Sequence, residues 1–159
     1  VDISKKMLDI ARRRALREKL DIEFKQMDSQ NLQFPNNIFD AVISMATIEF
    51  IPDPDRMITE MFRVCKDEGF ILVGTINRES EWGKLYQDTE FQKNVPVFKH
   101  AYFKSPEDLS KLKQDAIIKI KECLFISPDM PESQISLKKE EELASQNRGG
   151  FFCILWQKK

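Results

Sequence analysis

The chain has 159 residues, and its 25 Lys and Arg nearly balance its 26 Asp and Glu, for a formal net charge of −1. This length fits one domain with a substantial core, and the balanced charge argues against nucleic acid or an anionic membrane surface as a partner, because both attract a basic excess. Residues 1–5 are not followed by an apolar segment of the signal-peptide type, and no apolar run reaches the roughly 18 residues of a membrane span, so the sequence predicts a cytoplasmic protein with no membrane partner.

The cysteines indicate a reducing compartment. Cys65, Cys123 and Cys153 are far apart and odd in number, a pattern that suits neither a disulfide framework nor a zinc site. Each is expected to lie in the core as a small apolar side chain. The sequence therefore predicts no metal site and no disulfide.

In chain order, the first elements alternate between helix and strand. Ser4 can cap a helix that begins at Lys5, where apolar residues recur at helical spacing as far as Leu16. Residues 22–27 alternate well enough for a strand. Residues 39–45 form a nearly continuous apolar run, which is typical of a strand covered on both faces.

The next helix and strand extend this alternation. A helix is expected to begin near Asp55, since the apolar residues after it share one helical face, and to end at Gly69. Residues 70–76 are expected to form another buried strand. Helices that alternate with strands over short links imply a parallel sheet flanked by helices.

The second half of the chain has a different pattern. A short helix is expected over residues 80–87. Ser105 begins another helix, with Pro106 at the first helical position and the acidic residue Asp108 three positions after the cap.

Two long strands are expected near the end of the chain, at residues 116–126 and 150–157. The segment between them has no room for the usual crossover helix, so an antiparallel pair is predicted. That segment includes residues 128–149, which are polar and charged. We expect an insertion there that forms a mobile loop or carries a short helix.

Several stretches in the first half, taken in their order and spacing, resemble one protein family. They are Phe39-Asp40-Ala41-Val42-Ile43-Ser44, Ile51-Pro52-Asp53-Pro54 and Glu60-Met61-Phe62-Arg63-Val64-Cys65-Lys66. Together they resemble the middle of the class I methyltransferases of the type 11, ubiquinone/biotin-synthesis-like group, where a strand with FD-x-V, a substrate-side loop and a helix ending in E-x-x-R-V-L-K follow one another. Upstream, Val1-Asp2-Ile3-Ser4 resembles the acidic end of the family's second strand, and Met27-Asp28-Ser29 resembles the acidic turn after its third. The resemblance covers residues 1–80 well and the remainder in outline.

The resemblance implies an α/β fold, with a Rossmann-like methyltransferase sheet that is mostly parallel and has an antiparallel C-terminal strand pair. In this family a glycine-rich loop follows the first strand and precedes the acidic strand end, whereas this chain begins at that acidic end. We therefore expect one methyltransferase domain over residues 1–159, truncated at its N-terminus, in which the first strand, the glycine loop and the first helix are absent. A strand edge left open in this way would favour pairing between two chains, so a homodimer is one expectation.

The family uses S-adenosylmethionine as its cofactor, and the resemblance assigns binding roles to four residues of this chain. Asp2 would accept the ribose hydroxyls and Ile3 would lie against the adenine, since ligands bind at the carboxyl ends of parallel strands. Asp28 would accept a hydrogen bond from the adenine amino group, with Ser29 beside it. Each has an ordinary alternative: a helix cap or surface acid for Asp2, a core side chain for Ile3, and an Asx turn for Asp28.

Four further residues are candidates for the reacting end of the site. Ser44 and Met45 would face the methionine part of the cofactor, although Met45 also suits a core position. Glu49 could orient the acceptor or take a proton, or be a solvated loop acid. His100, the only histidine, belongs to a region that lines the acceptor pocket in related enzymes, or it is an exposed loop residue. Because methyl transfer needs little beyond an aligned nucleophile and a cationic sulfonium, a general base is not required.

These observations favour an enzyme that transfers a methyl group from S-adenosylmethionine to a small-molecule acceptor. A nicotinamide-binding Rossmann oxidoreductase shares the acidic strand end, but the antiparallel tail and the FD-x-V to E-x-x-R-V pattern argue against it. A third hypothesis stays open, because the sequence starts after the position of the family's glycine-rich loop. It is a methyltransferase-like domain that has lost its cofactor site and serves as a binding or regulatory subunit. The acceptor and its reacting atom do not follow from the sequence, since one fold supports many chemistries.

Overall fold

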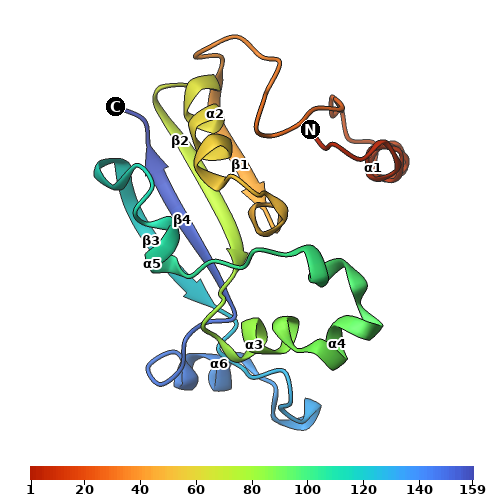
Figure 1. Ribbon diagram of the computed structural model, residues 1–159, viewed down its shortest axis with the longest axis vertical. Coiled ribbons are helices and arrows are strands. Elements are labelled where there is room, and N and C mark those ends of the chain that lie inside the picture. Colours follow the sequence, from red (N-terminus) through yellow and green to blue (C-terminus); the bar gives the residue numbers. More distant parts are fainter.

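A mixed sheet of four strands organises the computed structural model, which describes residues 1–159 (Figure 1). The strands are β1 (Phe39–Met45), β2 (Cys65–Ile76), β3 (Ile117–Cys123) and β4 (Phe151–Gln157), and their order in the sheet is β1-β2-β4-β3. β1 pairs with β2 in parallel, whereas β4 is antiparallel to both β2 and β3. Three strands thus run in one direction, and β4 inserts between two of them in the opposite direction. The expected α/β fold with an antiparallel C-terminal pair is confirmed.

Short helices and helical turns connect the strands. The α-helices are α1 (Lys5–Glu18), α2 (Pro54–Val64), α3 (Glu81–Gln87), α4 (Thr89–Asn94), α5 (Pro106–Leu109) and α6 (Leu137–Leu143). The 3₁₀ turns are η1 (Ile48–Phe50), η2 (Pro96–His100), η3 (Gln114–Ala116) and η4 (Glu132–Gln134). None of these helices is long and apolar enough to cross a membrane.

One face of the sheet carries the hydrophobic core. The register aligns Ile71 and Val73 of β2 with Trp156 and Ile154 of β4, and none of the four is more than 1% exposed. The side chains of α2 that join this core are Met57, Ile58 and Met61. The amphipathic helix α2 therefore packs on the sheet as its one-sided apolar pattern predicts.

The opposite face and the outer edge of β1 are more open. The register places Ile43, Met45 and Phe70 on that face, where they are 64%, 49% and 43% exposed. The prediction that residues 39–45 are covered on both faces is therefore wrong, because no element of this structure packs over that face of β1. β1 pairs only with β2, so its other edge has no strand partner in this sheet. Figure 1 shows α1 and the N-terminus on the β1 side, away from the other helices.

The N-terminal segment begins as predicted and then departs from the prediction. The Ser4 side chain caps α1 by accepting a hydrogen bond from the Met7 backbone N–H at 3.3 Å. The strand predicted at residues 22–27, however, is reduced to a single parallel bridge between Asp2 and Gln26. Because the segment pairs only with the short stretch around Asp2, it cannot build the hydrogen-bonded ladder that defines a strand.

The predicted end of α2 at Gly69 is wrong. α2 ends at Val64, and β2 begins at the next residue, Cys65, whose backbone is extended with ψ 142°. Glu68 takes the left-handed conformation, with φ 61°. Gly69 lies inside β2, where a Cβ would come within 2.8 Å of the Asp40 carbonyl oxygen. The glycine therefore permits two strands to approach closely and does not stop a helix.

The predicted antiparallel strands and the helix start at Ser105 are confirmed. The Ser105 hydroxyl accepts a hydrogen bond from the Asp108 backbone N–H at 3.2 Å, and the Asp108 carboxylate accepts one from the Ser105 N–H at 3.0 Å. This reciprocal capping box fixes the first turn of α5. The helix is only 4 residues long.

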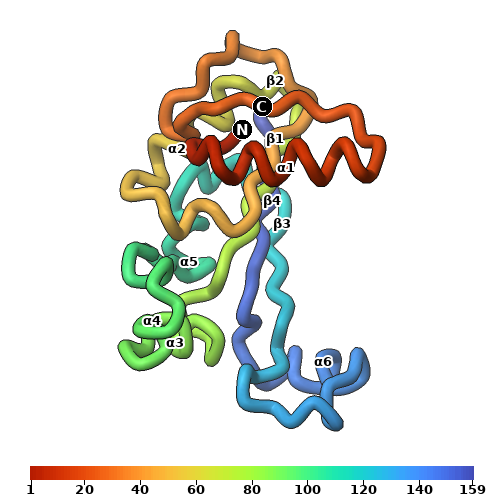
Figure 2. Tube along the Cα trace, turned by 90° about the vertical axis from the view of Figure 1, so that its right-hand side faces the viewer, coloured from red at the N-terminus to blue at the C-terminus, as the bar shows by residue number.

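The segment between β3 and β4 extends away from the sheet and carries η4 and α6 (Figure 2). Its start is held by two side chains that form hydrogen bonds with its backbone. The Glu140 carboxylate accepts from the Phe125 N–H at 2.8 Å and from the Ile126 N–H at 2.9 Å, and the Trp82 indole N–H donates to the Ile126 carbonyl at 2.7 Å. We propose that residues 128–149 are an insertion within one domain, anchored through these contacts.

Candidate functional site

A cavity of about 540 Å³ lies between the N-terminal segment and the carboxyl end of β1. Its lining comes from Val1–Ile3 and Met7, from Met27–Gln30, from Ala46, Thr47 and Phe50–Pro52, and from Val97. Asp2 and Asp28 are its only acidic residues, and 8 of the 14 lining residues are hydrophobic. Because ligands of such sheets bind outside the carboxyl ends of parallel strands, this cavity is the candidate functional site.

Asp2 is half-buried and held in a defined orientation at the cavity. Its backbone pairs with the segment beside it, through the Met27 N–H at 3.1 Å and the Lys25 carbonyl at 3.3 Å. Its Oδ1 accepts a hydrogen bond from the Ser4 backbone N–H at 2.7 Å, while Oδ2 has no donor from the protein. Ile3, 68% exposed, lies next to it in the lining. Ser4 caps the helix, so Asp2 is not needed as the cap. Asp2 therefore keeps one carboxylate oxygen that a ligand can use.

Asp28 lies across from Asp2 on the neighbouring segment. Its Oδ1 accepts a hydrogen bond from the Gln30 backbone N–H at 2.8 Å, which is the Asx turn that the sequence allowed. Its Oδ2 has no donor from the protein, and both Asp28 and Ser29 line the cavity. The turn and the ligand role are compatible, since each uses a different oxygen. The structure thus brings together all four residues predicted for the cofactor's nucleoside end.

Charged side chains of α2 hold the loop that follows Asp28. Arg63 donates from Nη1 to the Phe34 carbonyl and from Nη2 to the Leu32 carbonyl, both at 2.7 Å. Glu60 pairs with the Arg63 guanidinium at 2.7 Å and accepts the Leu32 backbone N–H at 2.7 Å. Hydrogen bonding to Arg63 lowers the pKa of Glu60 below its ordinary value. The E-x-x-R pair of α2 therefore fastens a loop that has no regular structure of its own.

A third α2 side chain extends this clamp to the cavity. Arg56 donates from Nε to the Gln30 carbonyl at 2.9 Å, and Gln30 lines the cavity two residues after Asp28. The sequence marked Glu60 and Arg63 only as part of a family motif and did not mark Arg56. The spacing of Glu60 and Arg63, three residues apart on a helix, was the available signal of a pair.

The end of β1 turns before it reaches the cavity. Ser44 is half-buried and Met45 is 49% exposed, and neither lines the cavity. Ala46 takes the left-handed conformation, with φ 50°, and its N–H donates to the Gly74 carbonyl at 2.9 Å. This turn presents Ala46 and Thr47 to the cavity instead. A contact of Ser44 or Met45 with the cofactor stays a prediction.

Glu49 is buried behind the cavity wall. Its side chain belongs to a residue only 1% exposed, and its Oε2 accepts a hydrogen bond from the Thr75 hydroxyl at 2.9 Å. Burial raises the pKa of Glu49 above its ordinary value, and the hydrogen bonds to its backbone and to Thr75 offset this only in part. The alternative of a solvated loop acid is therefore wrong. The adjacent residue, Phe50, is the one that lines the cavity.

Replacement of Glu49 by glutamine is expected to change how stability depends on pH. A carboxyl whose pKa rises on folding binds protons more tightly in the folded chain, so its contribution is greatest below the unfolded pKa and is lost as pH rises through the folded pKa. Glutamine does not titrate and keeps an oxygen for Thr75. Urea unfolding at several pH values should show the wild type losing stability relative to Glu49→Gln from acid to neutral pH. A difference that stays constant with pH would contradict this expectation.

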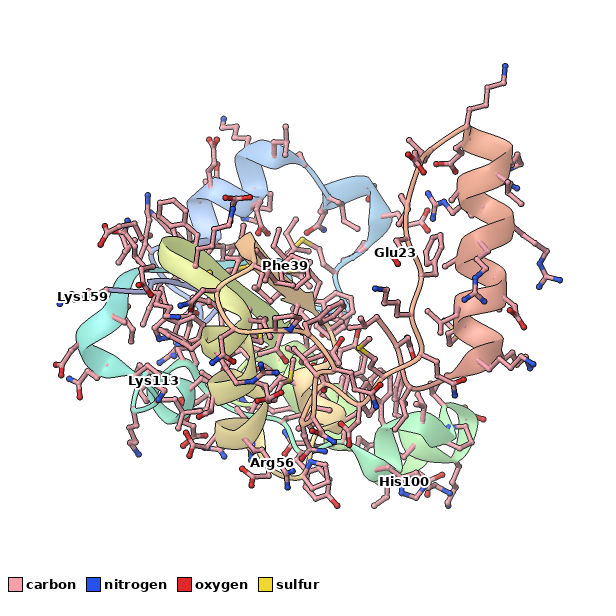
Figure 3. All side chains as sticks on the ribbon, turned by 90° about the horizontal axis from the view of Figure 1, so that it is seen from above. Glu23, Phe39, Arg56, His100, Lys113 and Lys159 are labelled. Carbon is pink, nitrogen blue, oxygen red and sulfur yellow. The ribbon has the colours of Figure 1, made fainter.

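His100 and the aromatic residues near it lie outside the cavity. His100 ends η2, is exposed, and lies at the periphery of the molecule in Figure 3. Inward from it, Phe98 stacks on Tyr86 with ring centroids 4.5 Å apart and on Phe50 with centroids 6.5 Å apart. Burial raises the pKa of Tyr86 above its ordinary value. The aromatic stack supports the cavity wall at Phe50. His100 itself is exposed, as in the alternative that the sequence left open for it.

The chain is similar to known methyltransferases in sequence. Residues 1–73 match the family model described as methyltransferase domain. An uncharacterised protein of Methanocaldococcus jannaschii is 31% identical over 159 residues, covering 99% of this chain and 72% of that protein. A ubiquinone biosynthesis O-methyltransferase of Coxiella burnetii is 33% identical over 78 residues, which cover 49% of this chain and 33% of that enzyme. The chain thus spans about a third of the length of this curated enzyme.

A solved structure extends the similarity to both halves of the chain. It comes from Thermotoga maritima and is described as a SAM-dependent methyltransferase, a possible histamine N-methyltransferase. It matches with a TM-score of 0.75 and 29% identity, over 99% of this chain and 70% of its own. The C-terminal part, beyond the residues that match the family model, therefore shares the fold of that protein.

Proposed function

The chain belongs to the class I methyltransferases, the family that uses S-adenosylmethionine, and we propose that the protein transfers the cofactor's methyl group to a small-molecule acceptor. The observation that carries this proposal is a single cavity with two carboxylates on one side and an uncharged lining on the other. Such a cavity suits a ligand with a polar nucleoside end and a reacting end that meets a second, less polar molecule.

The residues on the N-terminal side fit the nucleoside end of S-adenosylmethionine. Asp2 and Asp28 each keep one carboxylate oxygen without a protein donor, so each can accept hydrogen bonds from a ligand. Asp2 would bind the ribose hydroxyls and Asp28 the adenine amino group, with Ile3 and Ser29 against the base. The cofactor supplies an electrophilic methyl group on a cationic sulfur.

The other side of the cavity would receive the acceptor. Thr47, Phe50, Ile51, Pro52 and Val97 line it, and none of these side chains is ionisable. This lining supports transfer that depends on alignment of the acceptor with the methyl group. Glu49 and His100 do not reach this lining, so we assign the chemistry to positioning and not to a general base. The acceptor atom stays open, since one relative is an O-methyltransferase and a structural neighbour a possible N-methyltransferase.

Calorimetric titration with S-adenosylhomocysteine, the demethylated cofactor, tests this proposal. The wild-type protein should bind it, and Asp28→Asn should bind it about tenfold more weakly, about 1.4 kcal/mol. Asparagine keeps an oxygen for the Gln30 N–H but puts an amide N–H₂ where the free oxygen was. Asp21→Asn is the matched control, because Asp21 is exposed and outside the cavity. No binding by the wild-type protein would leave two explanations: a domain that needs the family's glycine-rich loop to bind the cofactor, or a non-catalytic, methyltransferase-like binding or regulatory domain.

A further inference from the structure

One carboxylate ties the insertion of residues 128–149 to the end of β3. Glu140, in the middle of α6, accepts the Phe125 N–H with both of its oxygens, each at 2.8 Å, and the Ile126 N–H at 2.9 Å. Hydrogen bonds from backbone N–H groups to a charged carboxylate belong to the stronger class. Glu140 is half-buried, whereas the next residue, Glu141, is exposed. Of these two acids, Glu140 is therefore the one that holds a defined piece of backbone.

The backbone that Glu140 holds has an unfavourable conformation. Leu124, the residue before Phe125, has φ 64°, in the left-handed region that leucine rarely adopts. Its carbonyl accepts the N–H of Gly150, just after the insertion, at 2.8 Å. Such a conformation persists only where the surrounding contacts determine it. We therefore expect the path of the chain at Phe125 and Ile126 to depend on Glu140.

The Ile126 carbonyl extends this arrangement to α3. It accepts a hydrogen bond from the Trp82 indole N–H at 2.7 Å, and Ile126 is only 9% exposed. The Trp82 ring also lies against Gly150, where a Cβ would collide with it. Because an indole has a single N–H donor, the position of the Trp82 ring depends on the position of this one carbonyl.

A row of aromatic rings continues from Trp82 to the cavity. Trp82 and Tyr86 lie about one turn apart on α3, with ring centroids separated by 6.0 Å. Tyr86 stacks on Phe98 at 4.5 Å and Phe98 on Phe50 at 6.5 Å, with 23° between the ring planes in both pairs. Phe50 lines the cavity, and so does Val97, the residue before Phe98. Since closely packed side chains transmit strain, a displacement of Trp82 is expected to reach the cavity wall.

We propose that Glu140 is a positioning residue for the acceptor side of the cavity, and that it acts through Trp82 and the ring stack that ends at Phe50. Loss of its carboxylate would free the backbone at Ile126, move the carbonyl that holds the Trp82 indole, and so shift Phe50 and Val97. The importance of this for an acceptor rests on the proposed function, whereas the coupling between Glu140 and Phe50 does not.

The nucleoside side of the cavity lies outside this path. Asp2 accepts the Ser4 N–H, Asp28 accepts the Gln30 N–H, and a backbone bridge joins Asp2 to Gln26. None of these contacts involves the insertion or α3. The proposal therefore predicts an effect on the acceptor side and none on the cofactor side.

Methyl NMR of ¹³C-labelled protein measures the coupling. Val97 and Ile51 line the acceptor side and follow or precede a ring of the stack in sequence, so a shift of the rings changes their methyl signals through the ring current. Glu140→Met should displace both signals, and the Trp82 indole N–H should exchange faster with solvent. Glu141→Met is the matched control, because it removes the same charge from an exposed position of the same helix. Unchanged signals in Glu140→Met, or an equal displacement in Glu141→Met, would overturn the proposal.

Two further variants separate positioning from a general loss of structure. Trp82→Phe keeps an aromatic ring and removes the indole N–H, so it should displace the same two methyl signals while the Glu140 contacts remain. In the double variant of Glu140→Met with Trp82→Phe, the displacements should not add, because both changes interrupt one path. Glu140→Gln keeps an oxygen for the backbone N–H groups and should restore most of the wild-type spectrum. Additive displacements, or no effect of Trp82→Phe, would overturn the route, and Trp82→Phe decides it even where Glu140→Met does not fold.

Titration with S-adenosylhomocysteine separates this proposal from the proposed function. The affinity of folded Glu140→Met should stay within about twofold of the wild-type value, because distant sites without shared partners act independently. A larger loss would contradict an effect confined to the acceptor side. If the wild-type protein did not bind S-adenosylhomocysteine, the proposed function would fail, and the methyl signals would still decide the role of Glu140.

Discussion

Asp2→Ala is expected to weaken the binding of S-adenosylhomocysteine by roughly a hundredfold, about 2.8 kcal/mol. The carboxylate keeps its Oδ2 free at the cavity, while its backbone pairing and the Ser4 N–H hold it in place. Hydrogen bonds from two ribose hydroxyls to a charged acceptor would contribute about 1.5 kcal/mol each, at the lower end of the range for charged groups. Alanine would remove both of these proposed bonds, whereas Asp28→Asn would remove one. Isothermal titration of the two variants beside the wild type measures this order directly.

The control variant for Asp2→Ala must remove the same negative charge and leave the cavity intact. Asp9→Ala serves this purpose, because Asp9 pairs only with Arg12 on the surface of α1, with both side chains more than 40% exposed. Circular dichroism of each variant shows whether α1 still forms after the Asp2–Ser4 bond is lost. Equal affinities of the wild type and a folded Asp2→Ala would rule out Asp2 as the ribose ligand.

Arg63→Met is expected to lower the free energy of unfolding by about 2–3 kcal/mol. The guanidinium donates to the carbonyls of Leu32 and Phe34 and pairs with Glu60, whose side chain is only 16% exposed. Its removal leaves these acceptors without donors and the Glu60 carboxylate without its counter-charge. Methionine keeps most of the apolar length of the side chain, so the loss reports the polar contacts. Urea unfolding measures it as a lower midpoint with an unchanged slope.

The same variant should also weaken the binding of S-adenosylhomocysteine by a few-fold, because the loop clamped by Arg63 leads from Asp28. Arg13→Met is the matched control, since Arg13 is an exposed residue of α1 outside the cavity. In the double variant Glu60→Gln with Arg63→Met, part of the lost stability should return, because no unpaired charge remains. A cost for Arg63→Met no larger than for Arg13→Met would show that the clamp contributes nothing to stability.

Local sequence patterns were sufficient for most of the elements. The Ser4 cap and the Ser105 capping box placed two helix starts, and apolar runs placed β1 and the end strands β3 and β4. These signals succeed because a cap satisfies backbone donors within three residues and because β-branched and apolar residues in a row favour an extended strand, even where one face stays exposed as in β1 and β3. The antiparallel C-terminal pair followed from the lack of a crossover helix between two long strands.

Predictions that depended on distant partners were less successful. Residues 22–27 have the alternation of a strand, yet they form only one bridge, because a strand exists only where a neighbour supplies the ladder. Gly69 has the composition of a helix stop, but its place against the Asp40 carbonyl puts it inside β2. Neither contact is visible in a local window of sequence.

For the candidate site, too, the sequence predicted some features and the tertiary structure decided the others. The family pattern located Asp2 and Asp28. The backbone bridge between Asp2 and Gln26 holds their two segments side by side, so both carboxylates line the same cavity. After β1, the structure buries Glu49, the predicted residue, and places its neighbour Phe50 at the cavity. The left-handed turn at Ala46 comes just before these two residues. The sequence by itself determined the family, the cofactor class and the order of the elements, since these depend on residue types and their spacing. Only the tertiary structure decided which side chains reach the cavity and that Arg63 holds its loop across about thirty residues, because side-chain direction and long-range contacts arise from packing.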